Sequence, residues 1–559
     1  MNAGGTDDAR ASVLYADTLY LVYCSLASLL DVHHPIVESA YGPDRVLDLV
    51  HMVQGEIDSV VVQVVDAFRS RRKYDEATKQ IQRAAMRRGG REEKKEEVGP
   101  DPLLLPILLG EVTMMSARTE IYWWQYLKKR IITGTAQPQA PKSPSGLEGD
   151  DEEDEVRRAE RKVAEEKRAE ERVRKLHALL HKSRVGMSMQ ELLSLYIVME
   201  GYYMEGMIAQ AVRDDRREEK GHTWSTSSVV DDTLYVVDKV IRRSLYSAST
   251  DTAAAVVNNV VTLLETSFYR ALADTIEAGF PSASNYAADM LASVGGVVPT
   301  GGASATKQAE SKEAYKCAVN NARSAADLIR QLKGKLLHAS VADDTGVMIG
   351  RTEAEQMKLS SALSQLDDVA RKMEQLAQRG CTSVAKVAIR PVIKSSCEQY
   401  LELHHQLTPE LLAEYEAVDP FIETFCVTID RTLAPFERSL AAENYQDLLL
   451  ASTDEVARTL ATAVLRCSYN RLGALQLDRE LRHLTAYLSG VAGFAAREKC
   501  TKLTQIVCIL NVETVEEARE VWQAGAGMAR ALGSNEFKKI LARRSDLPKS
   551  AVQNMELVT

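Results

Sequence analysis

Residues 470–496 read NRLGALQLDRELRHLTAYLSGVAGFAA. Apolar side chains recur in this stretch at steps of four and three residues, at Leu477, Leu481, Leu484, Leu488, Val491 and Ala495. This spacing places them on one face of an α-helix. The charged residues Asp478, Arg479, Glu480 and Arg482 are expected on the opposite face, with Asp478 and Arg482 spaced as a supporting pair. The stretch therefore predicts a helix packed along one side in an α-helical domain.

The rest of the chain has the same character. Long segments with a helical period follow one another from the N-terminal region to the C-terminal end, and no segment shows a convincing alternation of apolar and polar residues. No fixed-period repeat is visible in the sequence. The predicted fold class is all-α.

Length and charge limit the classes of function. A chain of 559 residues is too long for one hydrophobic core, so about three to five units are expected. The formal net charge of −10 argues against a general nucleic-acid binder, because phosphate binding needs concentrated positive charge.

Changes in composition predict five segments. The expected N-terminal helical module spans 8–135, and 136–156 is an acidic linker whose Pro, Ser and Gly content predicts disorder. A middle helical bundle over 157–300 begins with a charged, exposed helix at 156–175, which has too few apolar residues for a coiled-coil seam. The C-terminal bundle is expected over 305–485, and a small terminal helical module over 486–559.

Cysteine usage and the N-terminal sequence favour a cytosolic protein. The eight cysteines are scattered and form no Cys-x-x-Cys motif, which is typical of buried thiols in a reducing compartment. Asp7 and Asp8 lie where a signal peptide would carry positive charge. The apolar residues 11–30 are interpreted as an amphipathic helix rather than a membrane span.

Paired histidines are the strongest candidates for a metal site, and they are weak ones. His177 and His181 lie one helical turn apart, but Ala178 stands where a helical zinc protease has glutamate. No further ligands are apparent, so both histidines are predicted to be solvated and no metal is expected. The adjacent pairs His33–His34 and His404–His405 point in different directions on a helix and are unsuited to joint ligation.

A glycine-rich segment suggests a nucleotide site but does not meet the requirements of a dinucleotide-binding fingerprint. Gly525-Ala526-Gly527 resembles the start of a dinucleotide fingerprint, but Arg530 occupies the third small position. The preceding residues 513–522 read as a helix, whereas the fingerprint must follow a strand. With no Walker loop and no nucleophile elbow, the sequence predicts no catalytic residue, no cofactor and no enzyme activity.

Several separated blocks resemble one known family. Residues 470–481, Asn-Arg-Leu-Gly-Ala-Leu-Gln-Leu-Asp-Arg-Glu-Leu, strongly resemble a signature of subunit four of the conserved oligomeric Golgi complex. Collinear blocks at 34–43, 110–118, 203–239 and 510–522 resemble the middle and C-terminal regions of the same family. This resemblance covers almost the whole chain, which makes it far more specific than any single motif.

The resemblance implies an elongated array of helical-bundle modules of the type shared by multisubunit tethering complexes. It implies a non-enzymatic peripheral protein on the cytosolic face of the Golgi membrane, which tethers vesicles in retrograde transport within the Golgi. The implied partners are sibling subunits, syntaxin-type Golgi SNAREs and SM-family proteins. The family also carries a facing arginine and acid in its last module, and Lys502 and Glu536 occupy the matching positions, where the resemblance implies a structural ion pair and the alternative is two ordinary surface charges.

The family begins with a long coiled-coil arm used in assembly, whereas this sequence starts within the middle region, so assembly through such an arm is not assured.

Two alternatives to the Golgi function stay open. A helical scaffold of another tethering or secretory complex would share the same patterns. A nucleotide-binding enzyme with a site near Gly525 is a weaker alternative.

Overall fold

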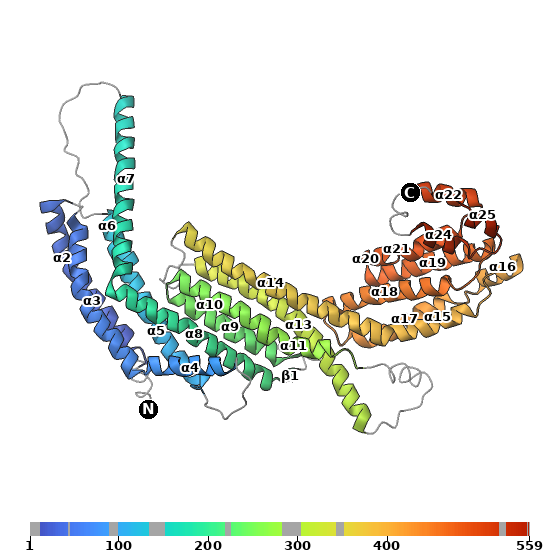
Figure 1. Ribbon diagram of the computed structural model, residues 1–559, viewed down its shortest axis with the longest axis horizontal. Coiled ribbons are helices and arrows are strands. Elements are labelled where there is room, and N and C mark those ends of the chain that lie inside the picture. Colours follow the sequence, from blue (N-terminus) through green and yellow to red (C-terminus); the bar gives the residue numbers. More distant parts are fainter. Residues whose placement is uncertain are drawn as a thin grey trace. The chain divides into compact units, whose positions relative to one another are not determined.

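The computed structural model describes residues 12–42, 45–88, 99–133, 151–218, 225–281, 303–341, 352–524, 533–555 and 557. Nearly all of these residues lie in helices, so the all-α prediction is confirmed (Figure 1). The chain divides into two compact units, each assembled from separated segments. The first comprises residues 1–214, 231–268 and 328–369, and the second comprises residues 215–230, 269–327 and 370–559.

The first unit is built around one central helix. That helix is α8 (Arg184–Arg213), which packs against α3, α4, α5, α7 and α10. Its buried side chains, Met189, Leu192, Tyr196, Met199 and Tyr203 among them, follow the helical period. The other elements of this unit are α2 (Leu14–Tyr41), α3 (Val46–Arg71), α4 (Tyr74–Arg88), η2 (Pro102–Leu104), α5 (Leu105–Ile121), η3 (Tyr122–Lys128), α6 (Lys129–Thr133), α7 (Asp151–Lys182), α9 (Ser228–Tyr246), α10 (Thr250–Leu263) and η4 (Leu264–Phe268).

The second unit is centred on α18 (Ala442–Val464), which packs against α15, α17, α19, α20 and α21. Two long helices, α13 (Ala303–Val341) and α14 (Glu353–Val384), contribute residues to both units. The remaining helices of the second unit are α11 (Tyr269–Glu277), η6 (Ala385–Ile389), α15 (Arg390–Leu401), α16 (Pro409–Ala417), α17 (Ile422–Glu437), α19 (Arg471–Ala492), α20 (Ala495–Lys499), α21 (Thr501–Leu510), α22 (Val515–Ala524), α24 (Ser534–Leu541) and α25 (Lys549–Gln553).

One small feature was not expected from the sequence. Strands β1 (Arg217–Glu218) and β2 (Thr226–Ser227) form a two-residue antiparallel pair. Asn321 of α13 holds this pair, because its Oδ1 accepts from Ser227 N at 2.9 Å and its Nδ2 donates to Ser227 Oγ at 2.7 Å. Strands this short carry no readable alternation, so periodicity could not reveal them.

The stretch that predicts the fold forms α19, with two corrections. Leu477, Leu481, Leu484 and Leu488 are buried as predicted, but the helix ends at Ala492 because Gly493 adopts a positive φ of 75°. Ala495 therefore begins α20 and is exposed. Glu480 was expected on the solvent face and is instead only 6 % exposed. It lies about 60° around the helix from the leucine stripe, so it falls within the surface covered by neighbouring helices.

A buried arginine links three helices of the second unit. Arg323 of α13 donates from Nε to Asn444 Oδ1 at 3.1 Å and from Nη1 to Glu374 Oε1 at 3.0 Å, and it also pairs with Asp447. These contacts satisfy a guanidinium that is only 6 % exposed. The arginine thereby ties α13 to α14 and α18.

The length and composition of the helices bear on membrane insertion. Among the described residues, no helix combines the length and the apolar content that crossing a bilayer requires. The predicted linker and exposed helix are described only in part: α7 begins at Asp151, and residues 134–150 lie outside the described part of the chain.

Candidate functional site

The two residues singled out from the sequence lie side by side. Lys502 lies in the first turn of α21, and Glu536 lies in the first turn of α24. The structure places Lys502 Nζ 2.8 Å from Glu536 Oε1, with side-chain exposures of 59 % and 40 %. An ion pair this exposed contributes about 0–1 kcal/mol to stability, because water screens the attraction.

A buried arginine that the sequence did not reveal makes far stronger contacts in the same region. Arg544 is 2 % exposed, and its Nη1 donates to the carbonyl oxygens of Leu510 and Val512, the latter at 2.7 Å. Its Nε and Nη2 donate to the two carboxylate oxygens of Asp546 at 2.8 and 3.0 Å. The guanidinium therefore caps the carbonyl end of α21 and fixes the segment after α24.

The start of α19 is joined to this C-terminal segment. Asp546 Oδ2 also accepts from Arg471 N at 3.0 Å, and the backbone of Tyr469 exchanges hydrogen bonds with Arg543 and Ser545. Asn470 caps α19, because its Oδ1 accepts from Gly473 N at 2.9 Å. The opening residues of the signature thus connect α19 to the end of the chain.

Gly473 allows α19 to approach the loop before α16 more closely than a larger residue would permit. A Cβ atom placed at Gly473 would lie 1.8 Å from the carbonyl oxygen of His405. Asn470 holds the same loop, since its Nδ2 donates to Leu407 O at 2.7 Å and its Oδ1 accepts from Leu407 N at 3.1 Å. The 470–496 stretch therefore encodes a close helix–loop contact as well as a leucine stripe.

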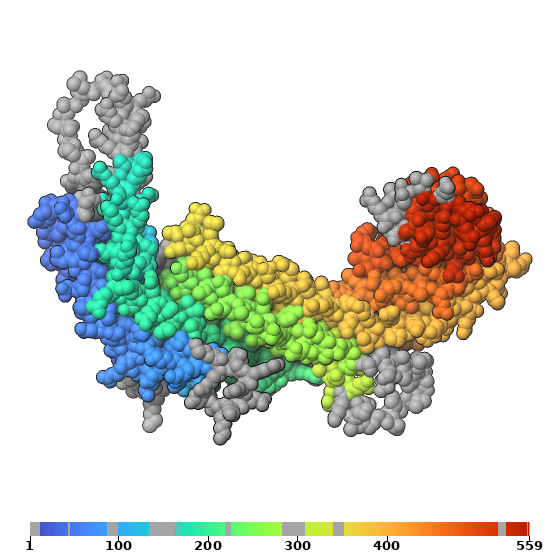
Figure 2. Space-filling view, in the orientation of Figure 1, coloured from blue at the N-terminus to red at the C-terminus, as the bar shows by residue number. Residues whose placement is uncertain are grey.

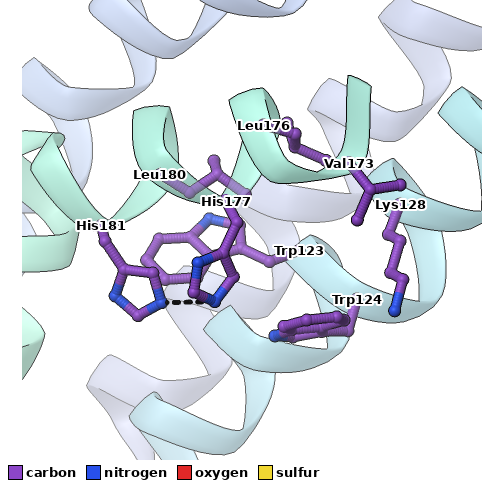
Figure 3. A pocket seen from close by; sticks show the side chains of 8 residues that line it. All are labelled: Trp123, Trp124, Lys128, Val173, Leu176, His177, Leu180 and His181. Carbon is purple, nitrogen blue, oxygen red and sulfur yellow. Dashed lines mark hydrogen bonds between the residues drawn. The ribbon is translucent and has the colours of Figure 1, made fainter. Parts of the chain in front are cut away.

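Two tryptophans and two histidines form a second cluster, in the first unit (Figure 3). Trp123 and Trp124 lie in η3, a π-helical segment, and each contacts a histidine of α7. The ring centroids are 6.1 Å apart for Trp123 and His181 and 5.5 Å apart for Trp124 and His177. Lys128 Nζ lies 4.1 Å from the Trp124 ring centroid, a cation–π distance. π-Helical turns are rare and often mark functional positions.

The histidine pair has the chemistry of a packed contact rather than a metal centre. The two Nε2 atoms are 2.9 Å apart, so one ring donates to the other and at least one is neutral. Burial lowers the pKa of His177, and the neighbouring His181 and Lys128 lower it further. Within the described residues, no group of three or more His, Cys, Asp or Glu side chains is placed to hold a metal ion. His177 is exposed and His181 is half-buried, so both rings reach solvent as predicted, but the sequence did not reveal their packing against the tryptophans.

Glu480 and two cysteines of the described part of the chain are buried groups with raised pKa values. Burial raises the pKa of Glu480 to about 7, but its Oε1 accepts a hydrogen bond from the amide of Gln476, at 3.0 Å, and not from a nucleophile. Burial likewise raises the pKa of the Cys381 and Cys397 thiols to about 12, which makes them poor nucleophiles at neutral pH. Gly525–Gly527 lie outside the described residues, but α22 ends at Ala524 directly before them, where a dinucleotide fingerprint needs a strand.

Comparison with known proteins gives matches along the whole chain. A family model described as "COG4 transport protein, middle alpha-helical bundle" matches residues 1–276, and one described as "Conserved oligomeric Golgi complex subunit 4, C-terminal" matches residues 315–539. The subunit 4 protein of Caenorhabditis elegans is 36% identical over 561 residues, covering 100% of this chain and 67% of the relative. The Homo sapiens protein is 34% identical over 568 residues, covering 99% and 68%.

The fold and these matches define an all-helical transport protein built from bundles. Among solved structures, the C-terminal domain of the exocyst subunit Sec6p aligns with a TM-score of 0.44 at 11% identity, covering 65% of this chain and 87% of that one. The family itself rests on the sequence matches. The chain belongs to the family of conserved oligomeric Golgi complex subunit 4.

Proposed function

We propose that this chain is a non-enzymatic scaffold subunit of the Golgi vesicle-tethering complex and acts in retrograde transport within the Golgi. The observation that carries the proposal is the family match over residues 1–276 and 315–539, in a chain whose described residues are almost entirely helical. Long helical faces offer binding surfaces for the helices of partner proteins. The proposed partners are sibling subunits of the complex, syntaxin-type Golgi SNAREs and SM-family proteins.

The proposed location is peripheral, on the cytosolic face of the Golgi membrane. Live-cell imaging of the fluorescently tagged chain tests it and separates this proposal from a role in another tethering or secretory complex. Co-localisation with Golgi markers is expected. Accumulation at sites of secretion on the cell surface would favour the alternative complex.

Binding to SNARE proteins is a separate part of the proposal. The purified chain, alone and in the reconstituted complex, is mixed with a cytosolic fragment of a Golgi syntaxin, with an endosomal syntaxin fragment as the control. Saturable binding to the Golgi fragment is expected. Equal binding to both fragments, or to neither in the complete complex, would contradict this part.

We further propose that Lys502 and Glu536 form the structural ion pair of the small terminal module. The 2.8 Å separation of Nζ and Oε1 supports this role. Lysine lacks the planar guanidinium fork, so the pair fixes geometry less strictly than an arginine would. The module boundary predicted at residue 486 is part of the same proposal.

A further inference from the structure

An open groove lies next to the tryptophan–histidine cluster of the first unit. The apolar side chains of Trp124 of η3, Ile132 of α6 and Val173 and Ala169 of α7 are called its floor here, and Lys128, Glu170, Arg174 and His177, which also line it, are called its rims. Its volume is about 590 Å³, within the range of protein ligand sites. In the space-filling view, the turquoise surface of α7 is visible beside the blue α2 and α3 (Figure 2).

The floor of this groove is apolar and accessible. Ile132 is 48 % exposed, and Trp124 and Val173 are half-buried. The π-helical turn lets both consecutive tryptophans face α7, so Trp123 fills the interior while Trp124 remains at the floor (Figure 3). An exposed aromatic and aliphatic floor of this kind gains free energy when another side chain covers it.

The surface around the groove is basic, although the chain as a whole is acidic. The net charge of the chain is −10. The described exposed or half-buried basic residues near the groove include Lys128, Lys129, Lys167, Arg168, Arg174 and Lys175, against the acidic Glu170 and Glu171. In the sequence of α7, Glu165 and Glu166 precede Glu170 by about one turn, and the acidic run at 151–155 lies about 20 Å away. The local field around the groove therefore favours an acidic partner.

The groove is lined by helices on both sides, an arrangement that suits a third helix. The groove runs between α6 and α7, and a third helix laid along two helices would bury Trp124 and Ile132 together. Apolar side chains on one face of the helix and carboxylates along its edges would match the floor and the rims.

We propose that this groove binds an acidic amphipathic helix of a sibling subunit. The proposal rests on the proposed function, because it takes the partner from the same complex. Trp124 and Ile132 receive the apolar face of the partner helix, and Lys128 and Arg174 pair with its carboxylates.

Photo-crosslinking in the reconstituted complex tests the proposal. A benzophenone-bearing amino acid is placed at Ile132, and as a control at Tyr235 of α9, which is 68 % exposed. The complex is purified by size exclusion and irradiated, and the linked peptides are identified by mass spectrometry. We expect a crosslink from position 132 to a segment of a sibling subunit. That segment should have apolar residues at helical spacing and should contain more Asp and Glu than Lys and Arg. Position 235 should give no such link.

Charge reversal supplies the second readout. Lys128→Glu together with Arg174→Glu should lower the crosslink yield at least fivefold in complexes that still assemble, whereas Lys239→Glu on α9 should leave it unchanged. An intact complex with no link from position 132, a link to a basic segment, or a yield unaffected by charge reversal would overturn the groove proposal alone. Groove-dependent binding to anionic phosphatidylserine vesicles without a sibling link would also overturn it. Failure of the unmodified chain to enter the complex would overturn both this proposal and the proposed function.

Discussion

Single residues set the geometry of the family signature, and Gly473 is the sharpest example. Gly473→Ala places a Cβ atom against the carbonyl oxygen of His405, at a separation of 1.8 Å if neither backbone moves. Because a backbone atom cannot move aside cheaply, we expect a loss of about 3 kcal/mol in unfolding free energy. Chemical denaturation of the purified chain measures this loss. Gly490→Ala in the same helix is the matched control, since no heavy atom lies within 4 Å of its Cβ.

The control should raise stability by about 0.5–1 kcal/mol, because alanine favours the helical conformation over glycine. Equal effects of the two substitutions would contradict the proposed close contact between α19 and the loop before α16.

Glu480 provides a prediction in pH. Its folded-state pKa of about 7 lies above the value near 4.3 of an unfolded chain, so its ionisation opposes folding. The contribution of Glu480 to folding stability is therefore fully present below about pH 4, where its carboxyl is protonated, and is lost as the pH rises through about 7. Glu480→Gln should therefore be about 1–3 kcal/mol more stable than the parent at pH 8, with a smaller difference at pH 5. Urea unfolding at pH 5, 6.5 and 8 tests this, and a difference independent of pH would contradict it.

The same residue shows what helical periodicity could and could not predict. The leucine positions of α19 followed from spacing alone, because one face of the helix is apolar. Glu480 lies at the edge of that face, and its burial depends on where neighbouring helices pack. That information is tertiary, and the sequence of one helix does not contain it. The contact between Gly473 and His405 was likewise hidden, because it joins a helix to a loop more than sixty residues away.

At the scale of elements, Arg544 holds the C-terminal helices together. Arg544→Lys keeps the charge but removes the planar fork that reaches two backbone carbonyls and Asp546. We expect a loss of about 2–4 kcal/mol, because buried acceptors are left without donors. Hydrogen exchange should become faster across α21 and α24. Arg543→Lys is the control, since Arg543 is exposed, and equal effects would show that the buried contacts are unimportant.

The Lys502–Glu536 pair should matter less. Lys502→Glu places two carboxylates together and should cost about 0.2–1 kcal/mol, a small effect because both side chains are partly exposed. The double exchange Lys502→Glu with Glu536→Lys should restore most of that stability. Thermal unfolding at low and high salt measures the coupling. A double exchange that is less stable than the single variant would contradict a direct pairing.

The Lys502–Glu536 pair could be predicted before the structure was known, whereas the role of Arg544 could not. Lys502 and Glu536 came from the resemblance, which supplied matching positions that neither composition nor spacing could offer. Arg544 belongs to a run of charged residues, Lys-Lys-Ile-Leu-Ala-Arg-Arg, that looks like an ordinary solvent-facing helix end. Its side chain is instead buried, where it donates hydrogen bonds to the carbonyl oxygens of Leu510 and Val512. The sequence likewise did not predict the cluster of Trp123, Trp124, His177 and His181, because a π-helical turn has no simple sequence pattern.

At the scale of the whole molecule, the all-α fold class was predictable because almost every segment carries a helical period. The grouping into units was harder, because α13 and α14 each contribute to both. A helix that serves two cores shows one continuous pattern, so composition alone marks no boundary within it. The five segments predicted from composition, 8–135, 136–156, 157–300, 305–485 and 486–559, stay predictions.

Membership in a Golgi tethering complex is the central claim, and quantitative affinity capture tests it most directly. The tagged chain is expressed at its natural level and recovered under mild detergent conditions, with an equally abundant cytosolic helical protein as the control. Mass spectrometry should return the other subunits of the oligomeric Golgi complex in near-stoichiometric amounts with the chain and not with the control. Recovery of subunits of a different tethering complex, or of none across the mild conditions, would contradict this membership.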